Sequence, residues 1–402
     1  MPGRSAFFAS TPPELQHAVA ARMASTPSAA FDWDRRPDTR PIGWTLPAEV
    51  TDVTGTSGRR CGPPVRSDSG SGQRGGVVTG VRIGLFVPPN DITAAIEAAQ
   101  RAESQGYWSV SLNDHFVPQT GPSDGPQLEC LTTLTAIAMR TERVRLVPSV
   151  IAASYRNPAL LAKIGATLDH VSGGRFVLGI GSGWNSAEYA AHGYHFGDAT
   201  ERLDHLEETL RIVKAMWTDD DPVVHGRHAH VEHASTEPRP LQQPQPPIMV
   251  GGSSRYLLGI AARHADIVNL IPPTANGKDF VKDADATVRF DRARLRRRNE
   301  LLDELAVQAG RDPATIERSG FTLAHVTEDP NDPVLEKFAR RLGFDDLATA
   351  QRSPVALLGT PEQVAEEMLS RRDEDRITYV VIAPSSPTAQ ALIADRVLPA
   401  VS

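Results

Sequence analysis

The sequence predicts an α/β fold, a (β/α)8 TIM barrel, and three observations support this prediction. From Val81 onward, short β-prone apolar runs alternate with stretches of helical periodicity. Eight such runs occur, and a helical stretch follows each of them. The runs are almost wholly apolar, which is typical of parallel strands covered by helices on both faces. Eight units over about 320 residues fit a closed barrel, and an open doubly wound sheet is the structural alternative.

The first four units are delimited by local signals. The strands are expected at 81–88, 108–114, 144–152 and at the start of 175–189, and the helices at 91–106, 128–141, 157–174 and 201–217. Pro88 ends the first strand, Asp91 is a plausible N-cap of the first helix, and Gly106 ends that helix. Asn157 with Pro158 gives the third helix an N-cap and a proline at its first position.

The last four units follow an insertion rich in His, Pro and Gln at roughly 219–246. The strands are expected at 246–252, 266–271, 321–327 and 378–384. The helical stretches are 254–265, a charged region that ends near 309–319, a region that includes 359–372, and 388–401. The arginine-rich sequence RARLRRRNE in the charged region is interpreted as a solvated helix face rather than a binding patch.

Residues 1–78 differ from the rest and are predicted to be a disordered N-terminal extension, with one barrel domain over 79–402. The extension is rich in Pro, Gly, Ser, Thr and Arg, and it has too little apolar surface to offset the entropy of ordering. It lacks the continuous apolar core of a secretory signal. A genuine tail and a wrongly assigned translation start both remain open.

Composition excludes several classes of function. With 42 basic and 49 acidic residues the net charge is −7, which argues against nucleic-acid binding. No apolar run approaches the roughly 18 residues of a membrane span, so no membrane contact is predicted. Cys61 and Cys130 form neither a disulfide framework nor a zinc ligand set, which indicates a cytoplasmic protein.

The sequence RFVLGIGSGWNSAEY resembles a dinucleotide-binding glycine loop but does not match one. Gly-x-Gly-x-x-Gly fails at Trp184 when it is started at Gly179, and at Ser186 when it is started at Gly181. Alternate glycines at a strand end instead allow a flat ligand to lie against the backbone at the barrel mouth. Tight packing inside the barrel is the alternative, and it would suffice for Gly179 alone. No serine-hydrolase motif surrounds Ser182.

Polar residues at three other places are candidates for a site. His115 ends the second strand and is favoured as a site residue over a packed structural histidine; Asp114 beside it either holds its tautomer or anchors a neighbouring loop. Ser253 and Ser254 are helix caps or part of an anion site. The sequence HGRHAHVEH carries four histidines: His225, His228, His230 and His233. It is interpreted as an exposed hairpin turning at Gly226, and we predict no metal site.

These residues together resemble the bacterial luciferase-like superfamily, and most closely its deazaflavin (coenzyme F-420)-dependent branch. The resemblance is carried by VRIGLFVPP, LNDHF, PPIMVGGSSRYLLGIAARHAD, GTPEQVAEEM and above all residues 157–196, and it covers Val81 to Ser402. It implies a TIM barrel with a flavin-type ring at its mouth and a non-prolyl cis peptide at Ser149–Val150. It also implies cofactor contacts from a set of loop residues: Asn113, Ser149, Val150, Gly181, Ser182, Gly183, Trp184, Asn185, Gly252 and Ser253.

The resemblance implies an oxidoreductase that moves a hydride between deazaflavin and a small organic substrate. His115 would donate or accept the proton, with Asp114 and Asn113 positioning it. A sugar-phosphate dehydrogenase subgroup carries a tryptophan where this chain has Gln119 and a glutamate where it has Trp184, so that substrate is not implied. The alternatives are an FMN-dependent monooxygenase, which uses oxygen and a separate flavin reductase, and a non-catalytic flavin-binding protein. A homodimer is common in the family.

Overall fold

The structure is a computed structural model that describes residues 80–119, 124–273 and 283–402. The predicted extension over residues 1–78 lies outside the described residues.

Eight parallel strands form the barrel, and each was expected from the sequence. They are β1 (Arg82–Phe86), β2 (Ser109–Leu112), β3 (Arg145–Pro148) with its continuation β4 (Ile151–Ala152), β5 (Leu178–Gly181), β8 (Ile248–Gly251), β9 (Ile267–Asn269), β10 (Glu317–Val326) and β12 (Ile377–Pro384). Their order in the sheet is β3-β2-β1-β12-β10-β9-β8-β5-β4. Leu146 donates its N–H to Arg175 O at 3.1 Å, and Val177 donates to Leu146 O at 3.1 Å. These bonds join β3 to the segment leading into β5, so the sheet closes and the TIM-barrel prediction is confirmed.

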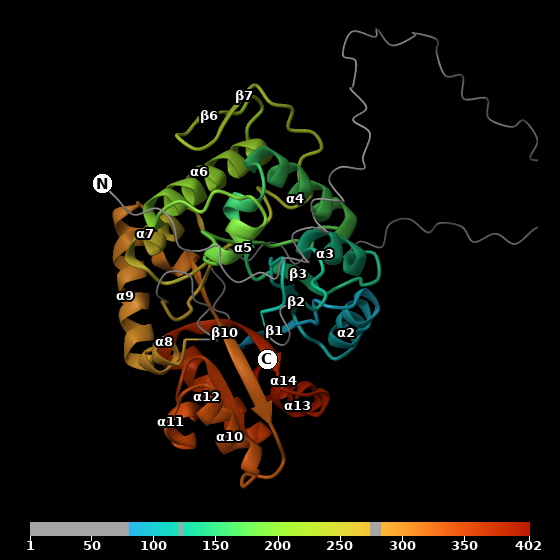
Figure 1. The fold of residues 1–402 in the computed structure, drawn as a ribbon, viewed down its shortest axis with the longest axis vertical. Coiled ribbons are helices and arrows are strands. Elements are labelled where there is room, and N and C mark those ends of the chain that lie inside the picture. Colours follow the sequence, from blue (N-terminus) through green and yellow to red (C-terminus); the bar gives the residue numbers. More distant parts are fainter. Residues whose placement is uncertain (1–79, 120–123, 274–282) are drawn as a thin grey trace, which may run out of the picture. The chain divides into compact units, whose positions relative to one another are not determined.

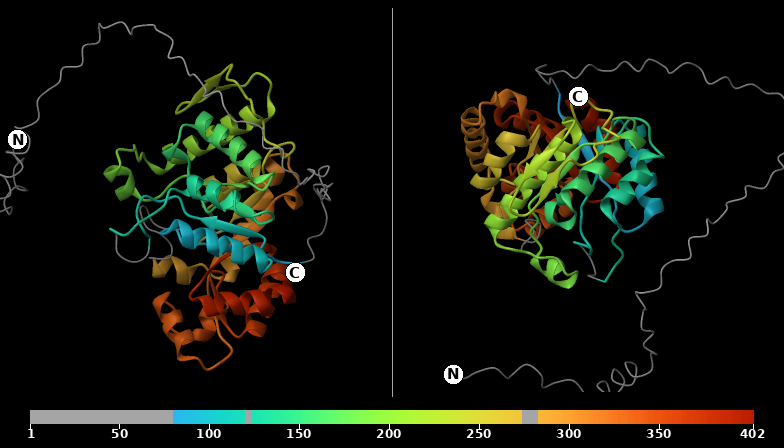
Figure 2. Two further views of the ribbon diagram at one scale, coloured as in Figure 1. Left: turned by 90° about the vertical axis from the view of Figure 1, so that its right-hand side faces the viewer. Right: turned by 90° about the horizontal axis from the view of Figure 1, so that it is seen from above.

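Helices surround the strands in the expected alternation (Figures 1 and 2). They are α2 (Ile92–Ser104), α3 (Cys130–Ala138), α4 (Pro158–Ser172), α5 (Ser186–Ala191), α6 (Ala199–Thr218), α7 (Arg255–His264), α8 (Ala284–Arg289), α9 (Arg292–Gln308), α10 (Pro333–Arg341), α11 (Leu347–Gln351), α12 (Pro361–Asp375), α13 (Pro387–Leu392) and α14 (Leu398–Val401). The predicted caps are confirmed, because Asp91 accepts from Ala94 N and Asn157 from Ala159 N and Leu160 N. Gly106 has the positive φ of a helix terminator, 87°.

The region before the seventh strand differs from the prediction. The charged helix α9 ends at Gln308, a 3-10 turn follows at Pro313–Thr315, and β10 already begins at Glu317. The sequence from Glu317 to Ser319 is charged and polar, so it was assigned to the helical region. These side chains have partners that lie far away in the sequence, since Glu317 pairs with Arg82 on β1 and Arg318 with Asp303 on α9.

A small lobe extends the barrel beyond β10. Strand β11 (Ala356–Gly359) pairs in parallel with the outer half of β10, and α10, α11 and α12 pack around it. No separate strand was expected there. This strand is short, with four apolar residues, and it directly precedes the expected helix.

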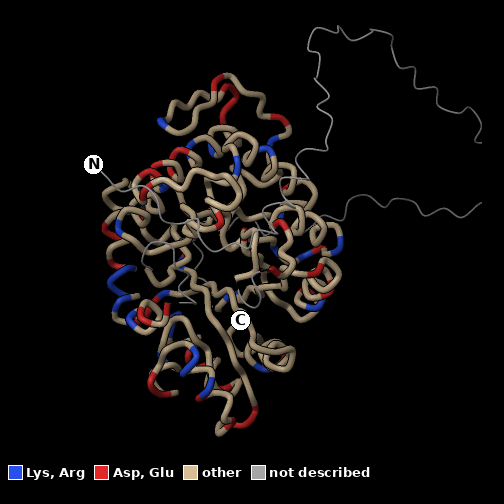
Figure 3. The backbone as a smooth tube through the Cα atoms, in the orientation of Figure 1, with Lys and Arg blue, Asp and Glu red and all other residues tan. Residues whose placement is uncertain are grey.

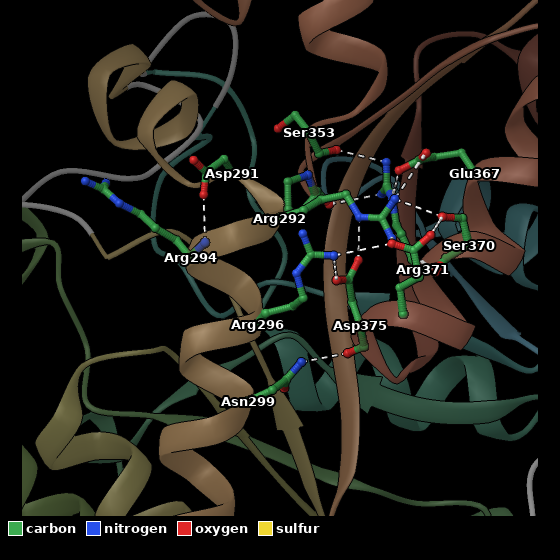
Figure 4. Close-up of polar contacts among 12 residues, drawn as sticks. Asp291, Arg292, Arg294, Arg296, Asn299, Ser353, Glu367, Ser370, Arg371 and Asp375 are labelled. Carbon is green, nitrogen blue, oxygen red and sulfur yellow. Dashed lines mark hydrogen bonds and ion pairs between the residues drawn. The ribbon is translucent and has the colours of Figure 1, made fainter.

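The helices α9 and α12 are joined by an ion-pair cluster (Figure 4). Asp375 binds Arg292 at 2.6 Å and Arg296 at 3.3 Å, while Arg371 binds Glu367 at 2.8 Å. Arg371 is buried and also donates to the carbonyls of Ser353, Pro354 and Ala356. The stretch RARLRRRNE therefore has one paired face, whereas the side chains of Arg294 and Arg297 are exposed. The solvated-face interpretation holds for these two residues. The arginines of α9 give the blue stretch at the left of Figure 3.

The insertion forms the expected hairpin. Strands β6 (Val223–His225) and β7 (His230–Glu232) pair in antiparallel, with Val224 and Val231 turned toward the core. Glu208 on α6 accepts the backbone N–H groups of Arg227, His228 and Ala229 at 2.7, 2.7 and 3.0 Å. One carboxylate from the helix below therefore fixes the turn of the hairpin.

Candidate active site

The candidate site lies where the carboxyl ends of β2, β4, β5 and β8 meet at the barrel mouth. Parallel strands place the residues that follow them at one end of the barrel, where TIM-barrel enzymes have their active sites. Asn113, Asp114 and His115 follow β2, residues 182–185 follow β5, and Gly252 with Ser253 follows β8. The barrel topology therefore gathers the residues that the sequence singled out.

The Ser149–Val150 peptide is cis, as the family resemblance implied, and it interrupts the third strand between β3 and β4. Val150 lies between two glycines of neighbouring strands. A Cβ atom on Gly181 would lie 3.0 Å from Val150 Cγ2, and one on Gly251 would lie 3.0 Å from Val150 Cγ1. Gly181 and Gly251 thus leave space for Val150. Ser149 and Val150 are half-buried, in contrast to the buried residues 146–148 before them, so they present surface at the mouth.

The other glycines of the loop have different roles. A Cβ on Gly179 would come within 1.8 Å of Pro148 O, so this glycine serves close packing within the barrel wall. Gly183 has a φ of 76°, and a Cβ there would meet the Tyr189 hydroxyl at 2.0 Å. The alternate glycines are therefore needed for different reasons: Gly179 for close packing, and Gly183 for a turn with positive φ.

His115 is paired with Glu188, the third residue of α5. His115 Nδ1 and Glu188 Oε2 are 2.8 Å apart, and the two side chains are 14% and 2% exposed. The same carboxylate accepts four further hydrogen bonds, each of 3.2 Å, from the N–H groups of Phe116 and Val117, the amide of Gln119 and the hydroxyl of Tyr155. Glu188 thus holds the imidazole and the loop after β2 together.

These donors determine the charge of Glu188. Burial raises the pKa of its carboxyl, but the hydrogen bond and charge of His115, with the bonds from Val117 and Tyr155, outweigh burial and hold the pKa below its ordinary value. The pKa of Tyr155 is raised by its burial and by Glu188, so it stays a hydroxyl donor. An ionised Glu188 accepts the Nδ1 proton of His115, which leaves Nε2 as the proton acceptor of the neutral ring.

Trp184 forms one wall beside this imidazole. The two rings are in an edge-to-face arrangement, with centroids 5.3 Å apart and an interplanar angle of 68°. In the part of the chain that the structure describes, His115 Nε2 has no hydrogen-bond partner. His115 thus has one nitrogen fixed by Glu188 and the other available to a ligand.

Asp114 does not hold His115. Its carboxylate binds the guanidinium of Arg156 through two bonds of 2.7 Å and accepts Ala152 N–H at 3.2 Å. This is the loop-anchoring role that the sequence left open. Asn113 Oδ1 accepts the amide of Gln127 at 3.0 Å, so Asn113 also contacts the loop rather than the imidazole.

The other face of the mouth offers main-chain donors at the start of α7. Gly252 has a φ of 138°, and Ser254 caps the helix by accepting Leu257 N–H. The Ser253 hydroxyl is buried and donates to Ile271 O at 2.6 Å, so its proton is not available for a phosphate. Asn185 caps α5 by accepting Glu188 N–H at 3.4 Å. The first turn of α7 also has backbone N–H groups at a helix N-terminus, a type of position that can bind an anion.

Across residues 80–119, 124–273 and 283–402, no group of three or more His, Cys, Asp or Glu could hold a metal ion. In the same ranges no helix has the length and apolar character needed to cross a membrane.

The sequence did not predict the roles of Glu188 and Tyr155, nor the hydrogen bond from Gln119 to Glu188. Asn185 and Glu188 have the spacing of a helix start, and an acidic residue in a first turn is common in any helix. What distinguishes Glu188 is that its side chain is buried. A helix of only six residues is too short for its sequence periodicity to reveal this.

The chain is similar to proteins of known kind. A family model described as luciferase-like monooxygenase matches residues 66–375. An FMNH2-dependent dimethylsulfone monooxygenase of Pseudomonas putida is 33% identical over 176 residues, which are 44% of this chain and 48% of that protein. An F420-dependent glucose-6-phosphate dehydrogenase of Amycolatopsis mediterranei is 34% identical over 165 residues, 41% of this chain and 48% of that protein. The chain thus spans about half the length of these curated relatives.

Solved structures share the fold. An F420-dependent secondary alcohol dehydrogenase in complex with an F420-acetone adduct superposes with a TM-score of 0.66 at 20% identity. The superposition covers 80% of this chain and 99% of that one. At this identity the likeness concerns the fold alone.

Proposed function

The chain belongs to the luciferase-like monooxygenase family, and we propose that it is a deazaflavin (F-420)-dependent oxidoreductase that interconverts an alcohol and its carbonyl by hydride transfer. The family match confirms the resemblance seen in the sequence. The proposal of this reaction rests on one observation, the His115–Glu188 pair with His115 Nε2 open at the barrel mouth. Alcohol oxidation needs a group that takes the hydroxyl proton while the hydride leaves, and a neutral imidazole near physiological pH suits that task.

The residues at the mouth fit a flat, flavin-type ring with an anionic tail. Val150, seated between Gly181 and Gly251, offers a half-buried apolar surface, which would support the ring. The loop 181–185 and the first turn of α7 would hold the tail, the latter through backbone N–H groups. When bound, the deazaflavin supplies the hydride acceptor for alcohol oxidation, or the hydride donor for the reverse direction.

The chain's own part is proton transfer and positioning. In alcohol oxidation His115 Nε2 accepts the hydroxyl proton, and in the reverse direction it returns the proton to the carbonyl oxygen. Glu188 keeps Nδ1 protonated and stabilises the imidazolium that forms, since a buried carboxylate lies 2.8 Å from that nitrogen. Glu188 is therefore a positioning residue. Trp184 would restrict the substrate to the space beside the imidazole.

An FMN-dependent monooxygenase is the second candidate. The observation that favours it is the likeness to the FMNH2-dependent dimethylsulfone monooxygenase, which is as high as the likeness to the F420-dependent dehydrogenase. That reaction would need oxygen and a flavin reductase as partner. A non-catalytic flavin-binding protein would bind a cofactor without any role for His115.

The test is a spectroscopic titration of the purified chain with F-420 and with FMN, each oxidised and reduced, followed by turnover with a panel of alcohols and carbonyls. We expect F-420 to bind at least about tenfold more tightly than FMN, a difference of about 1.4 kcal/mol. We also expect His115→Asn to lower turnover by about 100-fold or more with cofactor binding retained. Tighter FMN binding with oxygen-dependent turnover would favour the monooxygenase, and unchanged turnover in His115→Asn would contradict the role of His115.

A further inference from the structure

We propose that a cleft beside the barrel mouth is a second binding site, for a small anionic ligand with a flat ring, an aromatic carboxylate. The cleft has a volume of about 390 Å³. It is lined by residues 154–158 at the start of α4, by Tyr194, by His205 on α6, and by residues 228–230 at the tip of the hairpin. Neither His115 nor the loop 181–185 lines it, although Tyr155, which does, also donates to Glu188.

The histidines of the cleft differ from the other histidines of the hairpin. His225 lies 3.4 Å from Glu232 and His233 lies 2.8 Å from Asp221, so each of these two has a carboxylate partner. In the described part of the chain, neither His205, His228 nor His230 forms such an ion pair. Of these five histidines, the three that line the cleft are therefore the ones without a carboxylate partner among the described residues.

His205 and His228 face each other with ring centroids 5.9 Å apart. The pKa of His205 is lowered by its burial and further by His228, although Glu208 acts in the opposite direction. Glu208 is occupied by three backbone N–H groups of the hairpin turn. Burial and the neighbouring His228 both disfavour the charged form of His205, and a bound anion would favour it. Binding should therefore take up protons.

Among the residues that line the cleft, Arg156 is the one cation besides the histidines, and it already has carboxylate partners. The guanidinium of Arg156 is shared by Asp114 and Glu129, and Glu188 lies behind Tyr155, to which it is hydrogen-bonded. The start of α4 contributes the positive end of a 15-residue helix, and Asn157 already caps its first N–H groups. Anion binding in this cleft hence depends on protonated histidine, and it weakens as the pH rises.

The ring of the ligand is inferred from the aromatic walls. Tyr155 and Tyr194 both line the cleft, and their ring centroids are 4.9 Å apart with an interplanar angle of 48°. Phe116 packs against both tyrosines from the side of His115, with centroid distances of 5.0 and 5.7 Å. The cleft wall therefore contains aromatic rings, of which Tyr194 is the more exposed, and aromatic rings pack well against a flat ligand.

The test uses benzoate as the probe with the full-length chain, and benzamide as its neutral counterpart of the same shape. Calorimetric titrations are run at about pH 6 and about pH 8, on the two sides of the ordinary histidine pKa. We expect benzoate to bind at least about tenfold more tightly at the lower pH and benzamide to show no such change. His228→Asn should remove the difference. The matched control is His225→Asn, a change in the same hairpin that leaves the cleft untouched.

Three outcomes would overturn the proposal. One is benzoate binding that is equal at both pH values. Another is an equal loss of affinity in His225→Asn and His228→Asn. The third is inorganic phosphate binding as tightly as benzoate, which would remove the role of the ring. Because His228 is exposed on the hairpin tip, its replacement should leave the fold intact, and circular dichroism of both variants checks this.

Discussion

Among the glutamate–histidine pairs of the described residues, the pair at the barrel mouth and one pair on the outer helices differ in what surrounds them. Glu188 and His115 meet at the barrel mouth at 2.8 Å, whereas Glu207 on α6 and His264 on α7 meet on the outer helices at 3.1 Å. Glu207 also binds Arg263 through two bonds of 2.7 and 2.9 Å. Glu188 has no arginine or lysine partner among the described residues, and its cationic partner is the imidazole.

This difference indicates which of the two pairs is suited to proton transfer. At the outer pair a permanent guanidinium charge neutralises Glu207, so the pair joins two helices whatever the state of His264. At the mouth, the carboxylate is held by neutral donors and one imidazole, and no guanidinium neutralises it among the described residues. The second nitrogen of His115 is open beside Trp184.

The largest expected effect separates the two pairs by activity. Glu188→Gln replaces the carboxylate by an amide that can donate to Nδ1, which would move the imidazole proton to Nε2 and remove the free acceptor. We expect turnover to fall by about 100-fold or more, the usual contribution of a positioned base. Glu207→Gln should leave turnover unchanged. Steady-state rates with the best substrate of the alcohol and carbonyl panel measure both.

The control for this prediction is a double variant. If Glu188 acts through His115, Glu188→Gln combined with His115→Asn should be no slower than His115→Asn alone. Additive losses would show that Glu188 has a separate role. Cofactor affinity, measured for each variant, distinguishes a loss of the site from a loss of proton transfer.

A smaller effect separates the pairs by stability. The pKa of Glu207 is lowered to about 2, first by the hydrogen bond from His264 and then by Arg263. Because the folded-state pKa lies below the unfolded one, its contribution is present above about pH 4.5 and is lost as the pH falls toward about 2. We expect Glu207→Gln to lower the free energy of unfolding by about 1 kcal/mol at neutral pH.

Urea unfolding at several pH values checks this second prediction. The gap between the wild type and Glu207→Gln should close as the pH approaches about 2, where Glu207 becomes protonated in the folded wild type. A gap that stays constant down to that pH would mean that the ion pair is not its source.

The sequence predicted the barrel because its signals are local. Eight apolar runs, a cap at Asp91 and a cap with proline at Asn157 each concern neighbouring residues, and all recur in the structure. Where a strand begins with charged residues, as β10 does at Glu317, the prediction was wrong. The partners of such residues, here Arg82, lie far away in the sequence.

The candidate site was predicted in part, for a related reason. His115 was chosen as a polar residue at a strand end, which is a local property. Its partner Glu188 is 73 residues away and sits in a first helical turn, where an acidic residue needs no further explanation. The direction of Asp114, toward Arg156, was one of two alternatives that alternation along a strand could not separate. The cis peptide at Ser149–Val150 came from family resemblance alone.

On this interpretation, Glu188 holds His115 with Nδ1 protonated and Nε2 free. Nitrogen-15 NMR of the histidine side chains tests it directly, since the two ring nitrogens give distinct signals in each tautomer. We expect His115 to carry its proton on Nδ1 in the wild type and on Nε2 in Glu188→Gln. A wild-type His115 protonated at Nε2, or a tautomer unaffected by Glu188→Gln, would contradict it.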